Sequence, residues 1–161
     1  MRRFYYSNEC DDISGFESGY AVFDSHLHDH DDVDVIHYVL DAETDELAAY
    51  FSLVASALPY VVDGMMGGIP AVELKMFAID KKYQGLGVST LVFDEVIEAI
   101  EHITSEYIGA EYILLYSVPI EHVIGLYIKN GFQKAAGTFK AFESEFTRGC
   151  IPMYKELGAS Q

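Results

Sequence analysis

The feature that most constrains this chain is a strand that runs through a glycine-containing turn into a long helix, between Glu73 and Ile103. The apolar stretch Ala71–Ile79 predicts the strand, and Gly85–Ile103 predicts the helix. The helix has a single apolar stripe, and its acidic residues lie largely off that stripe, as in a helix that covers a core. A chain of 161 residues organised around such a unit is expected to form one α/β domain. The stripe consists of Val88, Leu91, Val92, Val96, Ala99, Ile100 and Ile103.

The other segments predict a mixed order of strands and helices. A strand over Leu47–Leu58 is expected to form a hairpin with the strand before it across the polar turn Asp41–Glu46, although its alanines also suit a helix. The stretch Pro59–Pro70 contains three glycines and predicts a mobile loop. Gly131 is expected to end a short helix. The remaining expected strands are Phe4–Tyr6, Val33–Leu40, Tyr112–Tyr116, Phe132–Thr138 and Ile151–Leu157, and the remaining expected helices are Asp12–Leu27 and Ile120–Asn130.

The charge and composition restrict the partners. The formal net charge is -16, which disfavours nucleic acid as a partner and favours a cationic substrate. No apolar run is long enough to span a bilayer, and the basic start Met1–Phe4 is followed by polar and acidic residues. We therefore expect a cytoplasmic protein that does not associate with membranes. Cys10 and Cys150 are too few for a disulfide framework and predict two reduced thiols.

The turn before the long helix predicts phosphate binding. The first amides of a helix lack partners within the helix and carry a partial positive charge, and glycine lets a ligand approach the backbone closely. No acidic residue occurs in Gln84–Phe93, and Lys81 and Lys82 lie just upstream. A P-loop needs a lysine after the glycines, and a dinucleotide fingerprint needs a third glycine where Thr90 stands, so both motifs fit poorly. A glycine turn without a ligand is the alternative.

Two segments resemble the GNAT superfamily of N-acetyltransferases. Gln84, Gly87 and Ser89 resemble its pyrophosphate-binding pattern Gln-x-x-Gly-x-Gly/Ala, with Ser89 in place of the last small residue. Tyr127–Phe132 resembles its Tyr-x-x-x-Gly-Phe segment. The resemblance implies an α/β (α+β) fold. Its mixed, mostly antiparallel twisted sheet would have about six to seven strands flanked by helices, and its splayed central strands would form the acetyl-CoA cleft.

The same resemblance implies a layout and an activity for the whole chain. Residues 1–161 would form a single acetyltransferase domain, with a substrate side at 1–70, an acetyl-CoA-binding core at 71–135 and C-terminal strands at 136–161. The implied reaction is the direct transfer of an acetyl group from acetyl-CoA to a primary amine of a small molecule or a protein. The resemblance implies no metal cofactor. It does imply a homodimer.

The resemblance also assigns roles to residues. Tyr127 would protonate the departing thiolate, because a phenol and a thiol have comparable basicity, but it could instead only pack. Glu73 would be the general base; it could instead be an exposed strand residue, and proton transfer through water without a dedicated base stays open. His122 ranks below Glu73 as a proton acceptor. The implied acetyl-CoA-binding residues are Phe77, Ala78 and Ile79, whose backbone would pair with the pantetheine arm, and Gln84, Gly85, Leu86, Gly87, Val88, Ser89 and Thr90 at the diphosphate.

Two further patterns leave alternatives open. The histidines and aspartates of His26–Asp32 are similar to a metal-binding tract, but a solvated polar turn is the preferred interpretation. The region Phe16–Leu27, together with Pro70–Ala71, resembles the front half of GNAT-type toxins that acetylate aminoacyl-tRNA, against which the acidic charge argues. A domain that binds CoA without catalysis is the third hypothesis.

Overall fold

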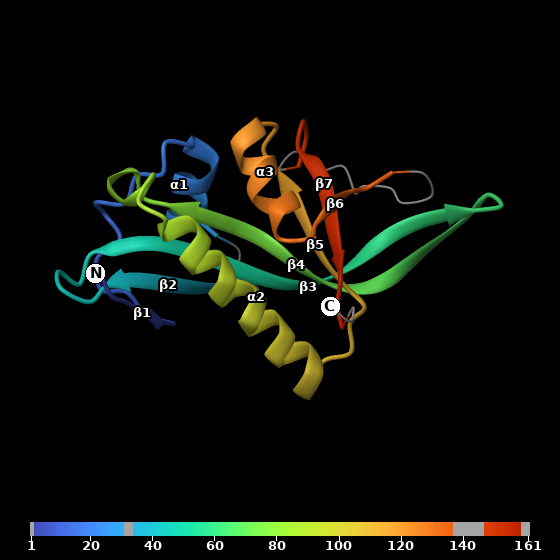
Figure 1. Ribbon diagram of the computed structural model, residues 1–161, viewed down its shortest axis with the longest axis horizontal. Helices are drawn as coiled ribbons and strands as arrows, with labels where there is room; N and C mark the ends of the chain where they lie inside the picture. Colours follow the sequence, from blue (N-terminus) through green and yellow to red (C-terminus); the bar gives the residue numbers. More distant parts are fainter. Residues whose placement is uncertain (1, 31–33, 137–146, 159–161) are drawn as a thin grey trace. The chain divides into compact units, whose positions relative to one another are not determined.

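The computed structural model describes residues 2–30, 34–136 and 147–158. The strands are hydrogen-bonded in the order β1-β2-β3-β4-β5-β7-β6 (Figure 1). β4 and β5 pair in parallel, whereas β1–β2, β2–β3, β5–β7 and β6–β7 pair antiparallel. The sequence-based prediction of a mixed, mostly antiparallel sheet is confirmed. The elements are β1 (Phe4–Ser7), α1 (Ala21–His28), β2 (Val35–Asp41), β3 (Leu47–Val62), β4 (Met65–Ile79), the 3-10 turn η1 (Lys81–Tyr83), α2 (Val88–Glu106), β5 (Tyr112–Ser117), α3 (Glu121–Lys129), β6 (Gln133–Lys134) and β7 (Ile151–Glu156).

The chain divides into two compact units. The first unit comprises Met1–Val54 and Lys75–Ile97, and the second comprises Ala55–Leu74 and Glu98–Gln161. The long elements β3, β4 and α2 each contribute residues to both units. The unit boundaries do not follow the divisions at residues 70 and 135 that the resemblance implied, and the single acetyltransferase domain remains a prediction.

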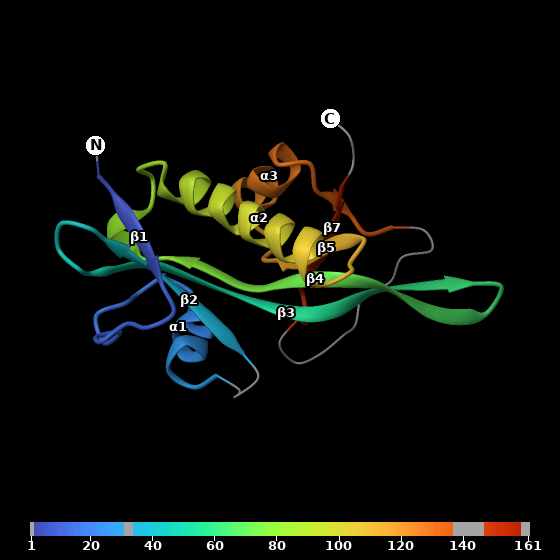
Figure 2. The same cartoon turned by 90° about the horizontal axis from the view of Figure 1, so that it is seen from below.

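The core of the first unit lies between α1 and the strands β2, β3 and β4. The Tyr50 hydroxyl donates to the Phe23 carbonyl oxygen at 2.6 Å, and the Tyr50 ring meets Phe16 edge to face. The other face of these strands carries the start of α2, where Phe77 packs against the fully buried Phe93. In Figure 2, α1 and the beginning of α2 lie on opposite sides of the strands. The buried cluster under α1 consists of Phe16, Leu27, Ile36, Leu47, Tyr50, Met76 and Ala78.

The core of the second unit is built around β5. Its central residues Ile113, Leu114 and Leu115 are at most 2% exposed, as expected for a strand in the middle of a sheet. Leu114 packs in a cluster with Leu58 and Ala71. The pairing of β4 with β5 joins Ala71–Leu74 to Tyr112–Leu115 and stops there, although β4 continues to Ile79 and β5 to Ser117.

The expected helix over Asp12–Leu27 is wrong for most of its length, because α1 covers only Ala21–His28. Upstream of α1, Asp12 Oδ1 accepts hydrogen bonds from the Ser14 amide at 3.0 Å and from the Ser14 hydroxyl at 2.6 Å. Such local side-chain bonds compete with helical ones. Gly19 also adopts a φ of +94°, which a right-handed helix excludes. The apolar residues have helical spacing, but the Asp12–Ser14 hydrogen bonds and Gly19 determine the backbone conformation.

The expected loop over Pro59–Pro70 is also wrong, because this stretch is the outer end of the β3–β4 hairpin. Asp63 and Gly64 form its turn with φ values of 50° and 75°. Asp-Gly is a preferred pair for a two-residue hairpin turn. A Cβ at Gly67 would lie 2.4 Å from the Tyr60 ring, so Gly67 makes room for that ring. The glycines therefore permit a two-stranded hairpin here, where the sequence had predicted a loop.

Smaller corrections concern the ends of elements. α2 begins at Val88 and extends to Glu106, because Gly85 and Gly87 have left-handed φ values of +76° and +77°. In the expected strand Phe132–Thr138, only Gln133–Lys134 is a strand, and residues 137 and 138 lie outside the described residues. In the His26–Asp32 tract, Asp31 and Asp32 also lie outside them.

Candidate functional site

The turn that joins β4 to α2 is held in place by two side chains. Asp80 Oδ1 accepts from the Lys82 amide at 2.9 Å, and Asp80 Oδ2 accepts from the Glu17 amide at 2.8 Å. The Gln84 side-chain amide donates to the carbonyl oxygens of Ile79 at 2.8 Å and Ser18 at 2.7 Å. The turn is thus fixed to the end of β4 and to the segment before α1.

The amides of this turn are available to an anion. The first hydrogen bond of α2 runs from the Leu91 amide to the Gly87 carbonyl oxygen at 3.3 Å. Within the described part of the chain, the amides of Gly85–Thr90 make no hydrogen bond of good geometry to a backbone or side-chain acceptor. No acidic residue lies in the first turn of α2. Unpaired amides at a helix start bind phosphate, and the donor set therefore fits a diphosphate.

The two lysines upstream of the turn are not free cations. Lys81 Nζ lies 2.7 Å from Glu17 Oε1, and Lys82 Nζ bonds Glu46 Oε2. The hydrogen bond to Glu17 raises the pKa of Lys81. These ion pairs reduce the positive charge that the two lysines could offer to an anion, so the backbone amides are the main candidate groups for anion binding.

The end of β4 presents alternating backbone groups. The Asp80 amide donates to the Ala48 carbonyl oxygen of β3 at 2.8 Å. Strand alternation then turns the backbone of Phe77 and Ile79 to the opposite edge, where the pairing with β5 has already stopped. The predicted pantetheine contact thus fits Phe77 and the Ile79 amide. It does not fit the Ala78 backbone, which faces β3, or the Ile79 carbonyl oxygen, which accepts from Gln84.

Tyr127 is a buried residue of α3. Its side chain is 7% exposed, and its ring centroid lies 6.0 Å from that of Phe132. Burial raises the pKa of Tyr127, so its phenol stays protonated at neutral pH. A buried, protonated phenol suits a shielded proton donor and equally suits a packing role. The catalytic role of Tyr127 stays a prediction.

Glu73 lies on β4 opposite Leu114 of β5 and is half-buried. The Ser56 hydroxyl of β3 donates to Glu73 Oε1 at 3.1 Å. This hydrogen bond orients the carboxylate. The alternative that Glu73 is only an exposed strand residue did not predict such a contact. Glu121 and His122 are exposed in the first turn of α3. Glu73 and Tyr127 belong to the second unit, whereas Phe77–Ile79 and Gln84–Thr90 belong to the first.

A buried charged group in the first unit was not found from the sequence. The Asp34 side chain is completely buried and binds Lys75 Nζ through both oxygens, and His26 Nε2 lies 3.4 Å from Asp34 Oδ2. Lys75 is a cation inside an apolar strand pattern, which was the one available hint. No group of three or more His, Cys, Asp or Glu side chains that could hold a metal occurs among the described residues.

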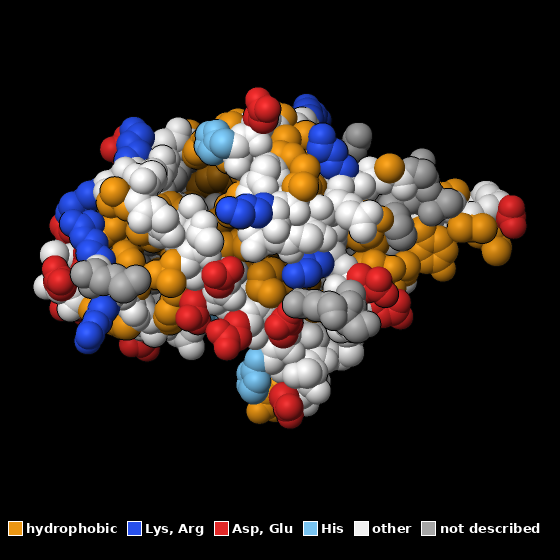
Figure 3. Space-filling model, viewed as in Figure 1, with side chains coloured by type: hydrophobic (Ala, Val, Ile, Leu, Met, Phe, Trp, Pro, Cys, Tyr) orange, Lys and Arg blue, Asp and Glu red, His pale blue; other side chains and the backbone are white. Residues whose placement is uncertain are grey.

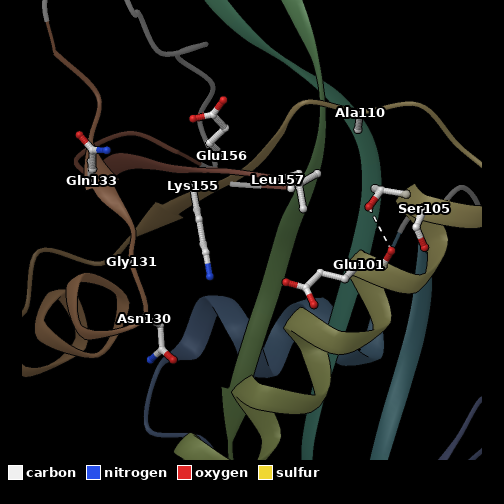
Figure 4. A pocket seen from close by; sticks show the side chains of 11 residues that line it. Glu101, Ser105, Ala110, Asn130, Gly131, Gln133, Lys155, Glu156 and Leu157 are labelled. Atoms are coloured by element: carbon white, nitrogen blue, oxygen red, sulfur yellow. Dashed lines mark hydrogen bonds between the residues drawn. The ribbon is translucent and has the colours of Figure 1, made fainter. Parts of the chain in front are cut away.

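A polar cavity of about 760 Å³ lies in the second unit (Figure 4). Lys155 of β7 and Glu101 of α2 point into it, and Asn130 lies at its edge. None of the predicted site residues lines this cavity. No helix among the described residues is long and apolar enough to cross a membrane.

The sequence matches no protein-family model and no curated protein. The fold, however, is similar to that of solved bacterial toxins. A crystal structure of a bacterial toxin has a TM-score of 0.76 and 21% identity, over 98% of this chain and 92% of that one. AtaT complexed with acetyl-methionyl-tRNAfMet has a TM-score of 0.72 and 16% identity, over 97% and 95% of the two chains. The KacTA–DNA complex has a TM-score of 0.71 and 18% identity, over 96% and 93%.

At these identities the likeness is one of fold, and it confirms the GNAT-like fold class that the motifs predicted. The expectation that nucleic acid is disfavoured as a partner gains no support, because two of these similar structures contain tRNA or DNA.

Proposed function

We propose that this protein is an acetyl-CoA-dependent N-acetyltransferase that acetylates a primary amine. The observation that carries the proposal is the row of amides from Gly85 to Thr90 at the head of α2, which make no well-formed hydrogen bond among the described residues and lie in a turn fixed by Asp80 and Gln84. The fold supports it, because the similar AtaTR structure was solved with AcCoA bound, at a TM-score of 0.73 and 14% identity.

The residues permit a direct transfer. The neutral amine attacks the thioester carbonyl carbon, so a C–N bond forms and the C–S bond breaks. Glu73, oriented by Ser56, accepts the proton that the amine loses, and Tyr127 gives a proton to the departing thiolate. The amides of Phe77 and Ile79 are the candidate donors to the thioester oxygen, where negative charge develops.

Ligand binding and turnover test the proposal separately. Acetyl-CoA is expected to raise the melting temperature, because a ligand that binds only the native state stabilises it. No shift at millimolar acetyl-CoA would exclude the proposal. Release of free CoA thiol is then measured with polyamines, aminoglycosides, amino acids, peptides and charged tRNA. A melting shift without thiol release from any acceptor would favour a non-catalytic CoA-binding module.

The acceptor we favour is the α-amine of an aminoacyl-tRNA, with a cationic small amine as the second candidate. The similar AtaT structure contains acetyl-methionyl-tRNAfMet. Despite the net charge of -16, the second unit carries three lysines on α3, β6 and β7. Lys129 ends α3, Lys134 pairs with Met153 in the β6–β7 ladder, and Lys155 follows on β7 beside Gly131. These cations are candidate contacts to phosphate.

Expression and acceptor assays test this acceptor. Induced expression is expected to arrest growth, and the purified protein is expected to block the α-amine of charged tRNA. Replacement of Lys129, Lys134 and Lys155 by glutamine should weaken tRNA acetylation while acetyl-CoA binding stays unchanged. Normal growth, together with release of CoA thiol only when small amines are supplied, would indicate a small cationic acceptor and not tRNA. AtaT has also been solved with the C-terminus of the antitoxin AtaR, which leads us to propose a protein partner for this chain.

A further inference from the structure

Two side chains of opposite charge point into the polar cavity of the second unit. Lys155 extends into it from β7 and Glu101 from α2 (Figure 4). The ion pairs among the described residues include neither of them. Lysine and glutamate side chains at a surface mostly extend into water, whereas these two converge on one hollow. The cavity therefore offers one cation and one anion to the same occupant.

The Lys155 side chain reaches the cavity beside Gly131, in the turn that follows α3. Gly131 has a φ of +90°, and its amide donates to the Ile128 carbonyl oxygen at 3.0 Å. A Cβ added at Gly131 would lie 3.4 Å from Lys155 Cε and 3.8 Å from Nζ. Glycine suits this turn because of its φ, and it also leaves the lysine stem its full space. The ammonium group thus lies against a backbone turn that carries no side chain.

The wall that α2 forms is negative. Thr104 and Ser105, in the last turn of α2, line the cavity. The end of a helix carries a partial negative charge, and no basic side chain lies in this last turn to offset it. The Thr104 hydroxyl donates to the Ile100 carbonyl oxygen at 2.8 Å, and the Ser105 hydroxyl donates to that of His102 at 3.2 Å. Both hydroxyl oxygens therefore remain as hydrogen-bond acceptors for an occupant.

The neutral side chains at the opposite end of the cavity add further polar groups. Asn130 Nδ2 donates to the Leu126 carbonyl oxygen at 2.7 Å, so Asn130 Oδ1 remains as an acceptor. Gln133 of β6 contributes a side-chain amide with a donor and an acceptor. Acceptors predominate among these neutral groups, which favours an occupant that carries hydrogen-bond donors.

The charges select among classes of ligand. A phosphate would meet the Glu101 carboxylate, and a polyamine would meet the Lys155 ammonium group. Glu156 does not change this balance, because it points away from Lys155 on the other side of β7 (Figure 4). Figure 3 shows lysine and carboxylate side chains interspersed on the face that carries α2 and β7. A ligand with both an ammonium and a carboxylate group gives each protein charge a partner.

We propose that this cavity binds a free amino acid. Its carboxylate pairs with Lys155, and its ammonium group pairs with Glu101 at the negative end of α2. The cavity volume of about 760 Å³ falls within the range of about 300–1,000 Å³ that is usual for ligand sites, so it also accommodates a polar side chain. None of the residues predicted for acetyl transfer lines the cavity, so this site is independent of the proposed function.

Calorimetric titration of the purified protein with L-glutamine, in the absence of acetyl-CoA, tests the proposal. The site is open to water, so we expect a dissociation constant of about 1 mM. Two matched compounds each lack one charge: N-acetyl-L-glutamine has no ammonium group, and L-glutamine amide has no α-carboxylate. Each should bind at least about tenfold more weakly, because one charged hydrogen bond is lost.

Variants locate the binding. Lys155→Gln and Glu101→Gln should each weaken L-glutamine binding by about fivefold or more, since each removes one charge pair. The matched controls are Lys134→Gln on β6 and Glu98→Gln on α2, which remove the same charges from exposed positions outside the cavity. Both controls should bind as the wild-type protein does. Circular dichroism verifies that all four variants fold.

The same titrations can overturn the proposal. Absence of binding up to about 20 mM L-glutamine would do so, because that concentration would occupy most of a millimolar site. Equal binding of the wild-type protein and the two cavity variants would place the amino acid elsewhere. Undiminished binding of N-acetyl-L-glutamine or of L-glutamine amide would show that the site recognises a single charge and not a zwitterion.

Discussion

Lys75 donates through Nζ to both carboxylate oxygens of Asp34, at 2.8 and 2.9 Å, and the Asp34 side chain is completely shielded from solvent. His26 of α1 approaches the same carboxylate, with Nε2 3.4 Å from Oδ2. One buried anion therefore joins α1, the residue before β2 and the strand β4. All three side chains belong to the first unit, so this contact holds its α1 layer against the sheet.

Removal of the Asp34 charge should destabilise the protein strongly. Asp34→Asn leaves Lys75 beside an uncharged amide, and breaking one partner of a buried ion pair costs about 3 kcal/mol or more. Urea unfolding measures the change in the free energy of unfolding. Asp29→Asn, at an exposed position just after α1, is the matched control and should change it by less than about 0.5 kcal/mol. Equal effects of the two substitutions would show that the buried pair contributes little.

The turn glycines should be required for acetyl-CoA binding. Gly85 and Gly87 adopt left-handed φ values with no atom within 4 Å of an added Cβ, so alanine would strain the backbone without a clash. That strain costs about 1–2 kcal/mol per residue and would move the amides of the turn. Gly85→Ala and Gly87→Ala should reduce the melting shift produced by acetyl-CoA. Gly15→Ala, where space is open and φ is not left-handed, should retain it. A full shift in the turn variants would argue against diphosphate binding there.

Tyr127→Phe should separate binding from catalysis. Loss of the phenol removes the proposed proton donor, which typically contributes about a hundredfold or more to the rate. We expect kcat to fall by that factor while the melting shift with acetyl-CoA is preserved. Phe132→Leu, which alters the packing beside Tyr127 but keeps the hydroxyl, is the control. Full activity of Tyr127→Phe would assign this residue to packing alone.

Stability should fall in alkaline solution because of Tyr83. Its side chain is 1% exposed, its hydroxyl donates to Asp41 Oδ2 at 3.0 Å, and burial together with Asp41 raises the pKa of Tyr83 to about 12. Unfolded tyrosine ionises near pH 10, so from about pH 10 to 12 the unfolded chain loses a proton that the native protein keeps. The contribution of Tyr83 to stability is thus complete below pH 10 and is lost as the pH rises toward 12.

The measurement compares urea unfolding at several alkaline pH values for the wild-type protein and Tyr83→Phe. The slope of stability against pH should be shallower in the variant by about 1 kcal/mol per pH unit. Parallel slopes would mean that Tyr83 ionises as readily in the folded state as in the unfolded one.

Regular apolar periodicity allowed most of the fold to be predicted. α2, β5 and β7 were found because each carries apolar residues that are buried in the fold, and burial of those residues determines the element. The error at Asp12–Leu27 arose where short polar side chains bond their own backbone, an energy that periodicity does not register. The error at Pro59–Pro70 arose because glycines were interpreted as loop residues, whereas Asp63–Gly64 is a hairpin turn and Gly67 accommodates the Tyr60 ring.

The candidate site, too, could be predicted from the sequence only in part. The turn from Gln84 to Thr90 could be predicted, because glycine and the lack of acidic residues are local properties of the sequence. The partners of Lys81, Lys82 and Asp34 could not be predicted, because each lies more than thirty residues away in the chain. Only the fold brings such residues together, and one sequence contains no information on which lysine meets which carboxylate.

The Gln84 side chain bonds a carbonyl group 66 positions earlier, at Ser18, as well as the end of its own strand at Ile79. An engineer who transplanted residues 80–90 into a foreign scaffold would move the anion-facing amides without these two acceptors. The smallest portable form of the turn therefore includes Glu17 and Ser18, and any redesign of the segment before α1 would also alter the position of the amides that we propose to bind the diphosphate of acetyl-CoA.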